Sequence, residues 1–70
     1  MNLISVESST IQAVGWESGT LAIQFSNGTI YNYKNVPQAL YEEFISSESI
    51  GKYFHAYIKS TFIGVKVWKK

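Results

Sequence analysis

The sequence predicts an α+β fold in which a small antiparallel β-meander of three to five strands packs against two helices. Two observations support this prediction. Apolar and polar residues alternate with a period of two between residues 10 and 34, and apolar residues recur at helical spacing between residues 37 and 60. Residues 1–70 are expected to form a single domain, because a chain of this length can build only one thin core.

The first hairpin is expected around the Ser18-Gly19 pair. If these two residues form a two-residue loop, Trp16 lies opposite Leu21 and Val14 lies opposite Ile23 on one face of the sheet. Small or polar residues alternate with these four and occupy the other face. This register satisfies the hydrophobic pattern without adjustment.

The second hairpin has two possible registers, which place the tyrosines differently. A two-residue loop would put Tyr31 and Tyr33 on the face opposite the core, as an aromatic platform. A three-residue loop ending at a left-handed Gly28 would oppose Tyr31 to Ile23 and Tyr33 to Leu21, so that both rings join the core. The hydrophobic pattern favours the three-residue loop, because the alternative would bury an asparagine and a lysine. The tyrosine hydroxyls could then still line a cleft.

Two helices follow. The first is expected to start at Pro37, and a serine-rich stretch at residues 46–49 ends it. Its buried stripe is expected to contain Leu40, Tyr41, Phe44 and Ile45. The second is expected to open at Ser47 or Ser49 and to end near Lys59 to Ser60. Its apolar stripe is expected to contain Ile50, Phe54, Tyr57 and Ile58.

Both ends of the chain can add strands. Residues 3–6 are compatible with an edge strand, and residues 63–70 alternate again as a final strand. Trp68 stands near the end of that strand beside two lysines. Such a tip is a candidate contact with a partner subunit, and the alternative is a frayed terminus.

The second helix carries the residues most suited to binding an anion. Lys52, His55 and Lys59 recur at i, i+3 and i+7 and therefore form one cationic line, unless they are an ordinary solvated face. Ser49 and Gly51 precede this line with a capping hydroxyl and a glycine that permits close approach. The candidate ligand-binding residues are Tyr31, Tyr33, Ser49, Gly51, Lys52, Tyr53, His55 and Lys59.

Composition argues against several function classes. The chain has one histidine, no cysteine and no aspartate, so we expect no catalytic residues, no metal site, no cofactor and no enzymatic activity. Arginine is absent, and the six lysines face five glutamates, which lowers the odds of a long nucleic-acid interface. We expect no export signal, because the first residues lack a charged region followed by a long apolar one, and no apolar run is long enough to cross a membrane. We therefore expect a soluble cytoplasmic protein.

The chain resembles the KTSC domain family, named after the C-terminal extension of some lysyl-tRNA synthetases and also found as short single-domain proteins in bacteria and phages. The resemblance covers about residues 6–59. It rests on Ser8-Ser9 with Ile11, Val14-Gly15-Trp16, Gly19-Thr20-Leu21 with Phe25, Tyr31-Asn32-Tyr33, Val36-Pro37, and Ser49 with Gly51-Lys52-Tyr53-Phe54. The family implies a small α+β domain with a meander packed on helices, and its synthetase context suggests RNA binding.

Three functions remain open. The first is a non-enzymatic module that binds a small nucleotide, with aromatic rings stacking the base and the Ser49 corner taking a phosphate. In a phage-type protein it would be a sponge that sequesters a signalling, cyclic nucleotide in the host cytoplasm, in a pocket formed between subunits of a homo-oligomer. The second is a protein-interaction or assembly module, and the third a single-stranded RNA binder.

Overall fold

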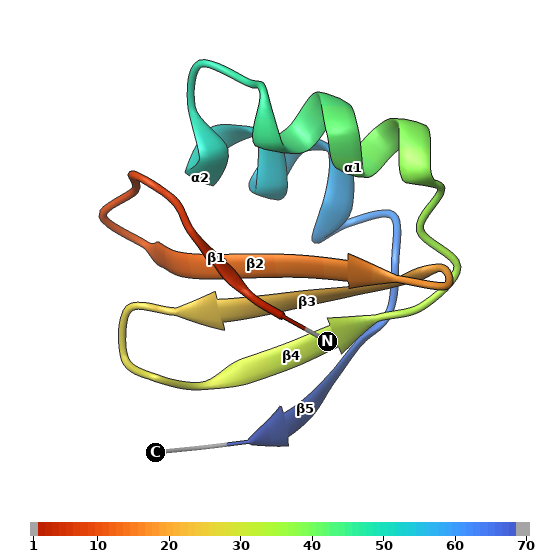
Figure 1. Cartoon of the computed structure of the whole chain (residues 1–70), viewed down its shortest axis with the longest axis horizontal. Helices are drawn as coiled ribbons and strands as arrows, with labels where there is room; N and C mark the ends of the chain where they lie inside the picture. The colour runs from red at the N-terminus through yellow and green to blue at the C-terminus, as the bar shows by residue number, and fades with distance from the viewer. Residues whose placement is uncertain (1, 69–70) are drawn as a thin grey trace.

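The computed structural model of the chain describes residues 2–68 and shows five strands and a helical layer (Figure 1). In chain order the elements are β1 (Ile4–Ser5), β2 (Ile11–Glu17), β3 (Thr20–Phe25), β4 (Ile30–Tyr33), α1 (Gln38–Ile45), α2 (Ile50–Tyr53), the π-helix η1 (Phe54–Ile58) and β5 (Gly64–Trp68). The strands form one sheet in the order β1-β2-β3-β4-β5, and each neighbouring pair is antiparallel. The predicted α+β meander with two helical segments is therefore confirmed.

The first hairpin has the predicted register. Trp16 pairs with Leu21 and Val14 pairs with Ile23 across β2 and β3. The two loop residues both have positive φ angles, 49° at Ser18 and 85° at Gly19. Two such residues make the tight turn whose twist matches that of the flanking strands.

The second hairpin has the three-residue loop that the hydrophobic pattern favoured. Tyr31 pairs with Ile23 and Tyr33 pairs with Leu21 across β3 and β4. Gly28 has a φ of 92°, and its N–H donates a hydrogen bond to the backbone oxygen of Phe25 at 2.9 Å. A residue with a Cβ is strained at this φ, so the glycine at this position fixes which face the tyrosines occupy.

The helix α1 begins one residue later than expected, because Pro37 is its extended N-cap residue rather than its first helical residue. Phe44 is completely buried, and Leu40 and Tyr41 pack partly buried against the core. Ile45 is 36% exposed, so the expectation that it belongs to the buried stripe is wrong. It is the last residue of α1, where the chain turns away through the serine-rich stretch.

The second helical segment starts as an α-helix and ends as a π-helix. Ser49 caps α2, which confirms one of the two predicted starts. At the other end, the Lys59 N–H donates a hydrogen bond to the backbone oxygen of Phe54, five residues earlier, at 2.9 Å, and this spacing defines a π-helix. Phe54 and Ile58 are buried, but Tyr57 is 55% exposed, so its predicted place in the apolar stripe is wrong. The wider π-turn changes the angular spacing on which that prediction depended.

The core lies between the sheet and the helices, which cover one face of the sheet (Figure 1). Buried side chains from both layers contribute to it: Ile11, Val14, Leu21, Ile23, Tyr33, Val36, Phe44, Ile50, Phe54 and Ile58. The Trp16 Nε1 donates a hydrogen bond to the Val36 oxygen at 2.8 Å, which ties the connection between β4 and α1 to the sheet.

The two terminal strands occupy the edges of the sheet. In β1, Ile4 pairs with Val14, and in β5, Gly64 pairs with Tyr33. Both edge strands were predicted, although β1 is shorter than the four residues expected. The predicted final strand ran to residue 70, and its last two residues lie outside the described residues.

Candidate ligand-binding site

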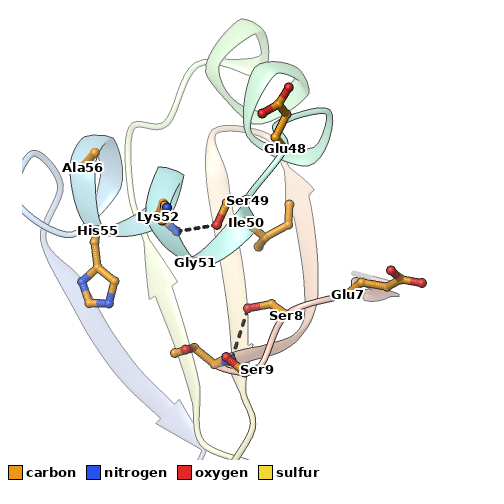
Figure 2. Close-up of a pocket in the computed structure, with 11 residues that line it drawn as sticks. Glu7, Ser8, Ser9, Glu48, Ser49, Ile50, Gly51, Lys52, His55 and Ala56 are labelled. Carbon is orange, nitrogen blue, oxygen red and sulfur yellow. Dashed lines mark hydrogen bonds between the residues drawn. The ribbon is translucent and has the colours of Figure 1, made fainter.

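Two cavities lie side by side where the segment before β2 approaches α2 and η1. The larger, of about 640 Å³, lies between the loop at residues 7–10 and the start of α2 (Figure 2). The smaller, of about 370 Å³, is lined mainly by aromatic rings of the sheet and of η1. Thr10 and His55 line both, so we treat the two as one continuous groove.

Hydroxyl groups from the loop and from the start of α2 line the larger cavity. The Ser8 Oγ accepts hydrogen bonds from the N–H groups of Thr10 and Ile11 at 3.2 and 3.3 Å. The Ser49 Oγ accepts one from the Lys52 N–H at 3.3 Å. A hydroxyl that accepts from the backbone keeps its own hydrogen, which it can donate to a ligand.

Gly51 lies where the loop and the helix approach each other. A Cβ built on Gly51 would lie 3.5 Å from the Ser8 Oγ, which is ordinary contact distance. The glycine therefore leaves room for about one additional small group beside the hydroxyl. A larger side chain at this position would fill the middle of the cavity.

Charges of both signs surround the larger cavity. Lys52 and His55 are exposed and line it from the helical side. Glu7 and Glu48 also line it, and Figure 2 shows that both side chains extend outward from its rim. The two carboxylates weaken an anion's binding, while their outward direction leaves the centre of the cavity to the hydroxyls.

The smaller cavity has an aromatic wall. Tyr31 meets Phe25 edge to face, with ring centroids 5.7 Å apart, and lies 6.4 Å from Tyr33 in a stacked arrangement. Tyr31 is half-buried, whereas only 6% of Tyr33 is exposed. Burial, and then the neighbouring Tyr31, raise the pKa of the Tyr33 hydroxyl above its ordinary value, so this group stays neutral at physiological pH. Lys59 stands beside these rings.

The structure gathers seven of the eight predicted site residues along this groove. Ser49, Gly51 and Lys52 line the larger cavity, Tyr31, Tyr33 and Lys59 line the smaller one, and His55 lines both. Both cavities are formed within a single chain, without a second subunit.

Tyr53 is the predicted residue that lies apart from the groove. The centroid of its ring lies 4.7 Å from that of the Tyr57 ring and 5.6 Å from that of the Phe44 ring. Its hydroxyl donates a hydrogen bond to the Glu43 Oε1 at 3.0 Å, and it lines neither cavity. Adjacent helical residues point about 100° apart, so Tyr53 cannot share the direction of Lys52.

Sequence reasoning missed the loop side of the groove. Ser8, Ser9 and Thr10 line the larger cavity, and Phe25 and Phe54 complete the aromatic wall of the smaller one. Three consecutive hydroxyl residues directly before a strand were the signal that could have drawn attention to this loop. Their closeness to Gly51 is a tertiary contact that no local pattern encodes.

Within residues 2–68, no group of three or more histidine, cysteine, aspartate or glutamate side chains is arranged to hold a metal ion. None of the helices formed by these residues has the length and apolar character needed to span a membrane.

The fold and the groove define a small α+β domain in which helices cover one face of an antiparallel sheet and meet a hydroxyl-rich loop. The family model for the KTSC domain matches residues 7–62. The chain therefore belongs to the KTSC domain family, as its motifs predicted.

Known relatives include a solved structure and both long and short proteins. The crystal structure of a KTSC domain protein from Yersinia pestis matches 96% of this chain and 97% of its own, with a TM-score of 0.90 and 32% identity. A lysine–tRNA ligase from Nostoc is 40% identical over 62 residues, which cover 86% of this chain and 11% of the ligase. A protein from Tsukamurella paurometabola is 34% identical over 86% of this chain and 92% of its own length. The chain thus spans about a tenth of the ligases that it matches.

Proposed function

We propose that this domain is a non-enzymatic binding module for a small phosphate-bearing nucleotide. The observation that carries the proposal is the continuity of the two cavities through Thr10 and His55. A polar corner with hydroxyls and a lysine lies on one side of these residues, and an aromatic wall lies on the other. A nucleotide has the same two parts, a phosphate and a planar base.

The chemistry of each end suits its part of the ligand. The hydroxyls of Ser8 and Ser49 can donate hydrogen bonds to phosphate oxygens, and Lys52 supplies a positive charge. The half-buried ring of Tyr31 offers a face on which a base can stack, a contact worth about 1–3 kcal/mol. The larger cavity, of about 640 Å³, lies within the usual size range of small-molecule sites.

A module that binds a nucleotide without converting it can act by sequestration. We therefore propose the role of a sponge for a signalling nucleotide, including cyclic nucleotides, as the biological form of this activity. This role needs tight binding and no turnover. A binding assay in which the ligand is recovered intact would distinguish it from an enzymatic role.

Calorimetric titration tests the proposal. We expect adenosine or guanosine monophosphates or cyclic dinucleotides to bind, and Lys52→Gln to weaken that binding by about tenfold, the usual worth of one charge-assisted hydrogen bond. Lys34→Gln is the matched control, because Lys34 lines a separate cavity with Asn35 and Phe62. An equal loss of nucleotide affinity in both variants, or no nucleotide binding to the unmodified chain, would contradict the proposal.

Self-association is the second candidate function, and the edge strand β5 is the observation that favours it. Four exposed apolar side chains gather on residues 63–68: Ile63, Val65, Val67 and Trp68, with exposed fractions of 83%, 52%, 52% and 50%. An edge strand with unpaired backbone groups is a template for a second strand. A second copy of this chain is the partner that we propose for it.

Sedimentation analysis tests self-association. The double variant Ile63→Glu with Val67→Glu places charges on this edge and is expected to convert a dimer into a monomer. Tyr57→Glu, which alters an exposed apolar residue elsewhere, should leave the dimer intact. A monomeric unmodified chain at high micromolar concentration would exclude this candidate.

Single-stranded RNA binding is the remaining alternative, and some relatives carry the name lysine–tRNA ligase. The lack of arginine and the near balance of charges oppose it. Affinity that grows with RNA length and falls steeply with salt would favour RNA over a small nucleotide.

A further inference from the structure

A lysine outside the predicted site is paired with a residue of the groove. Lys66 on β5 pairs with Tyr31 on β4. Directly paired residues of an antiparallel sheet point to the same face, with Cβ atoms about 5 Å apart. Lys66 therefore projects beside the ring of Tyr31, on the face of the sheet that the helices cover.

A bulge in β5 separates this lysine from the neighbouring tryptophan. Lys66 pairs with Tyr31 and Trp68 pairs with Ile30, so two adjacent residues of β4 face residues that are two apart on β5. Lys66 and Trp68 consequently point to opposite faces, whereas regular alternation would put them on the same one. The bulge puts the bulky indole on the face opposite Tyr31 and leaves Lys66 on the same face as the ring.

Cations thus stand at both ends of the aromatic wall. Lys52 lies at the serine corner, and Lys59 and Lys66 lie at the Tyr31 end. Among residues 2–68, neither Lys59 nor Lys66 is held in an ion pair by a carboxylate. The loop that contains Ser8 leads into β2, and three interstrand steps, about 14 Å, separate the backbone of β2 from that of β5, which carries Lys66. The strands at the two ends are therefore not neighbours, and we assign a separate phosphate to each end.

We infer that the ligand carries two phosphates, on the 5′ and 3′ sides of a nucleoside whose base stacks on Tyr31, with Lys59 and Lys66 holding the second phosphate. This inference rests on the proposed nucleotide-binding function and narrows its ligand. A nucleoside 3′,5′-bisphosphate, a linear dinucleotide with a 5′-phosphate and a cyclic dinucleotide share this chemistry. A nucleoside monophosphate has only one phosphate, so it would leave the lysines at one end of the aromatic wall without a phosphate.

Calorimetry with matched ligands tests the inference. The ligands are adenosine 5′-monophosphate, adenosine 3′,5′-bisphosphate, linear 5′-phosphorylated diadenylate and cyclic diadenylate. At least one of the three ligands with two phosphates should bind about tenfold more tightly than the monophosphate, and the order among them identifies the form that fits. Equal affinity for the monophosphate and all three others would overturn the inference.

Two lysine variants separate the inference from the proposed function. Lys66→Gln should reduce the affinity for the best ligand with two phosphates by about tenfold and leave the affinity for the monophosphate, held at the Ser49 and Lys52 end, unchanged. Lys52→Gln should weaken both. If Lys66→Gln alters neither affinity, or both equally, the second phosphate site is wrong while the nucleotide-binding function stands. If no ligand binds the unmodified chain, the function itself fails, and the inference fails with it.

Discussion

The ring of Tyr33 lies so close over Gly64 that a Cβ built on Gly64 would come within 2.5 Å of the Tyr33 Cε2. The two residues are paired across β4 and β5. The same ring packs edge to face against Phe54 of η1, with centroids 5.6 Å apart. Tyr33 therefore connects the edge strand to the helical layer and holds the aromatic wall of the groove in place.

Replacing Gly64 by alanine should destabilise the fold. The added methyl would collide with a ring that is itself packed against Phe54, so Tyr33 or β5 must shift, at a cost of about 1–3 kcal/mol. Urea unfolding measures this loss. Gly51→Ala is the matched control, because its methyl would have its nearest contact at 3.5 Å and alanine favours a helix. Equal stability of the two variants would contradict the packing described for Tyr33.

Replacing Trp16 by phenylalanine should also destabilise the fold, by about 1–2 kcal/mol. The change removes the hydrogen bond from Nε1 to the Val36 oxygen at 2.8 Å and leaves that buried carbonyl without its donor. Trp68→Phe alters a half-exposed indole and should change the free energy of unfolding by less than about 0.5 kcal/mol. Chemical denaturation followed by circular dichroism measures the free energy of unfolding of both variants. A larger loss of stability in Trp68→Phe than in Trp16→Phe would contradict this role of the Trp16 hydrogen bond.

Stability should fall at alkaline pH partly because of Tyr33. Burial and the nearby Tyr31 raise its pKa in the folded state, whereas an unfolded tyrosine ionises near pH 10. The stabilising contribution of the neutral hydroxyl is thus fully present below about pH 10 and is lost as the pH rises toward the folded-state pKa. Melting temperatures between about pH 9 and 11 should fall less steeply in Tyr33→Phe. If the melting temperatures of the unmodified protein and of Tyr33→Phe fall equally with pH, the ionisation of Tyr33 is not the cause of the loss of stability.

Neutralising the rim of the larger cavity should strengthen the binding of a phosphate-bearing ligand. Glu7 and Glu48 both line this cavity, and their charges repel an anion through solvent. Glu48→Gln should raise the affinity about twofold to fivefold at low salt, and the gain should shrink as salt is added. Glu42→Gln, on the exposed surface of α1, is the control. Weaker binding of the Glu48→Gln variant would indicate that the site does not hold an anion.

The sheet could be predicted from the sequence because its determinants are local. The period-two pattern, the Ser18-Gly19 turn and the left-handed Gly28 fix both hairpin registers, and the structure has them as predicted. The wrong predictions concern Ile45 and Tyr57, which were placed on buried helical faces by assuming that regular α-helical spacing continues to the end of each helix. Tyr57 turns outward because Phe54–Ile58 is a π-helix, and nothing in the local sequence marks that change.

The groove was only half predictable. Ser49 and Lys52 could be found because a capping serine and a following lysine are neighbours in the sequence. The loop at residues 7–10 meets Gly51 only through tertiary packing, and Lys66 reaches Tyr31 only through strand pairing. Positions brought together by the fold of the whole domain cannot be derived from spacing along one helix.

Mapping by nuclear magnetic resonance tests the nucleotide-binding groove most directly. A ¹⁵N-labelled sample is titrated with 5′-phosphorylated diadenylate, and backbone amide shifts are followed. We predict changes at Ser8 and Thr10, at Gly51 to His55, and at Tyr31, with none at Phe62 or Ile63 of the separate cavity. An absence of shifts at millimolar ligand, or shifts confined to residues 61–65, would contradict the account.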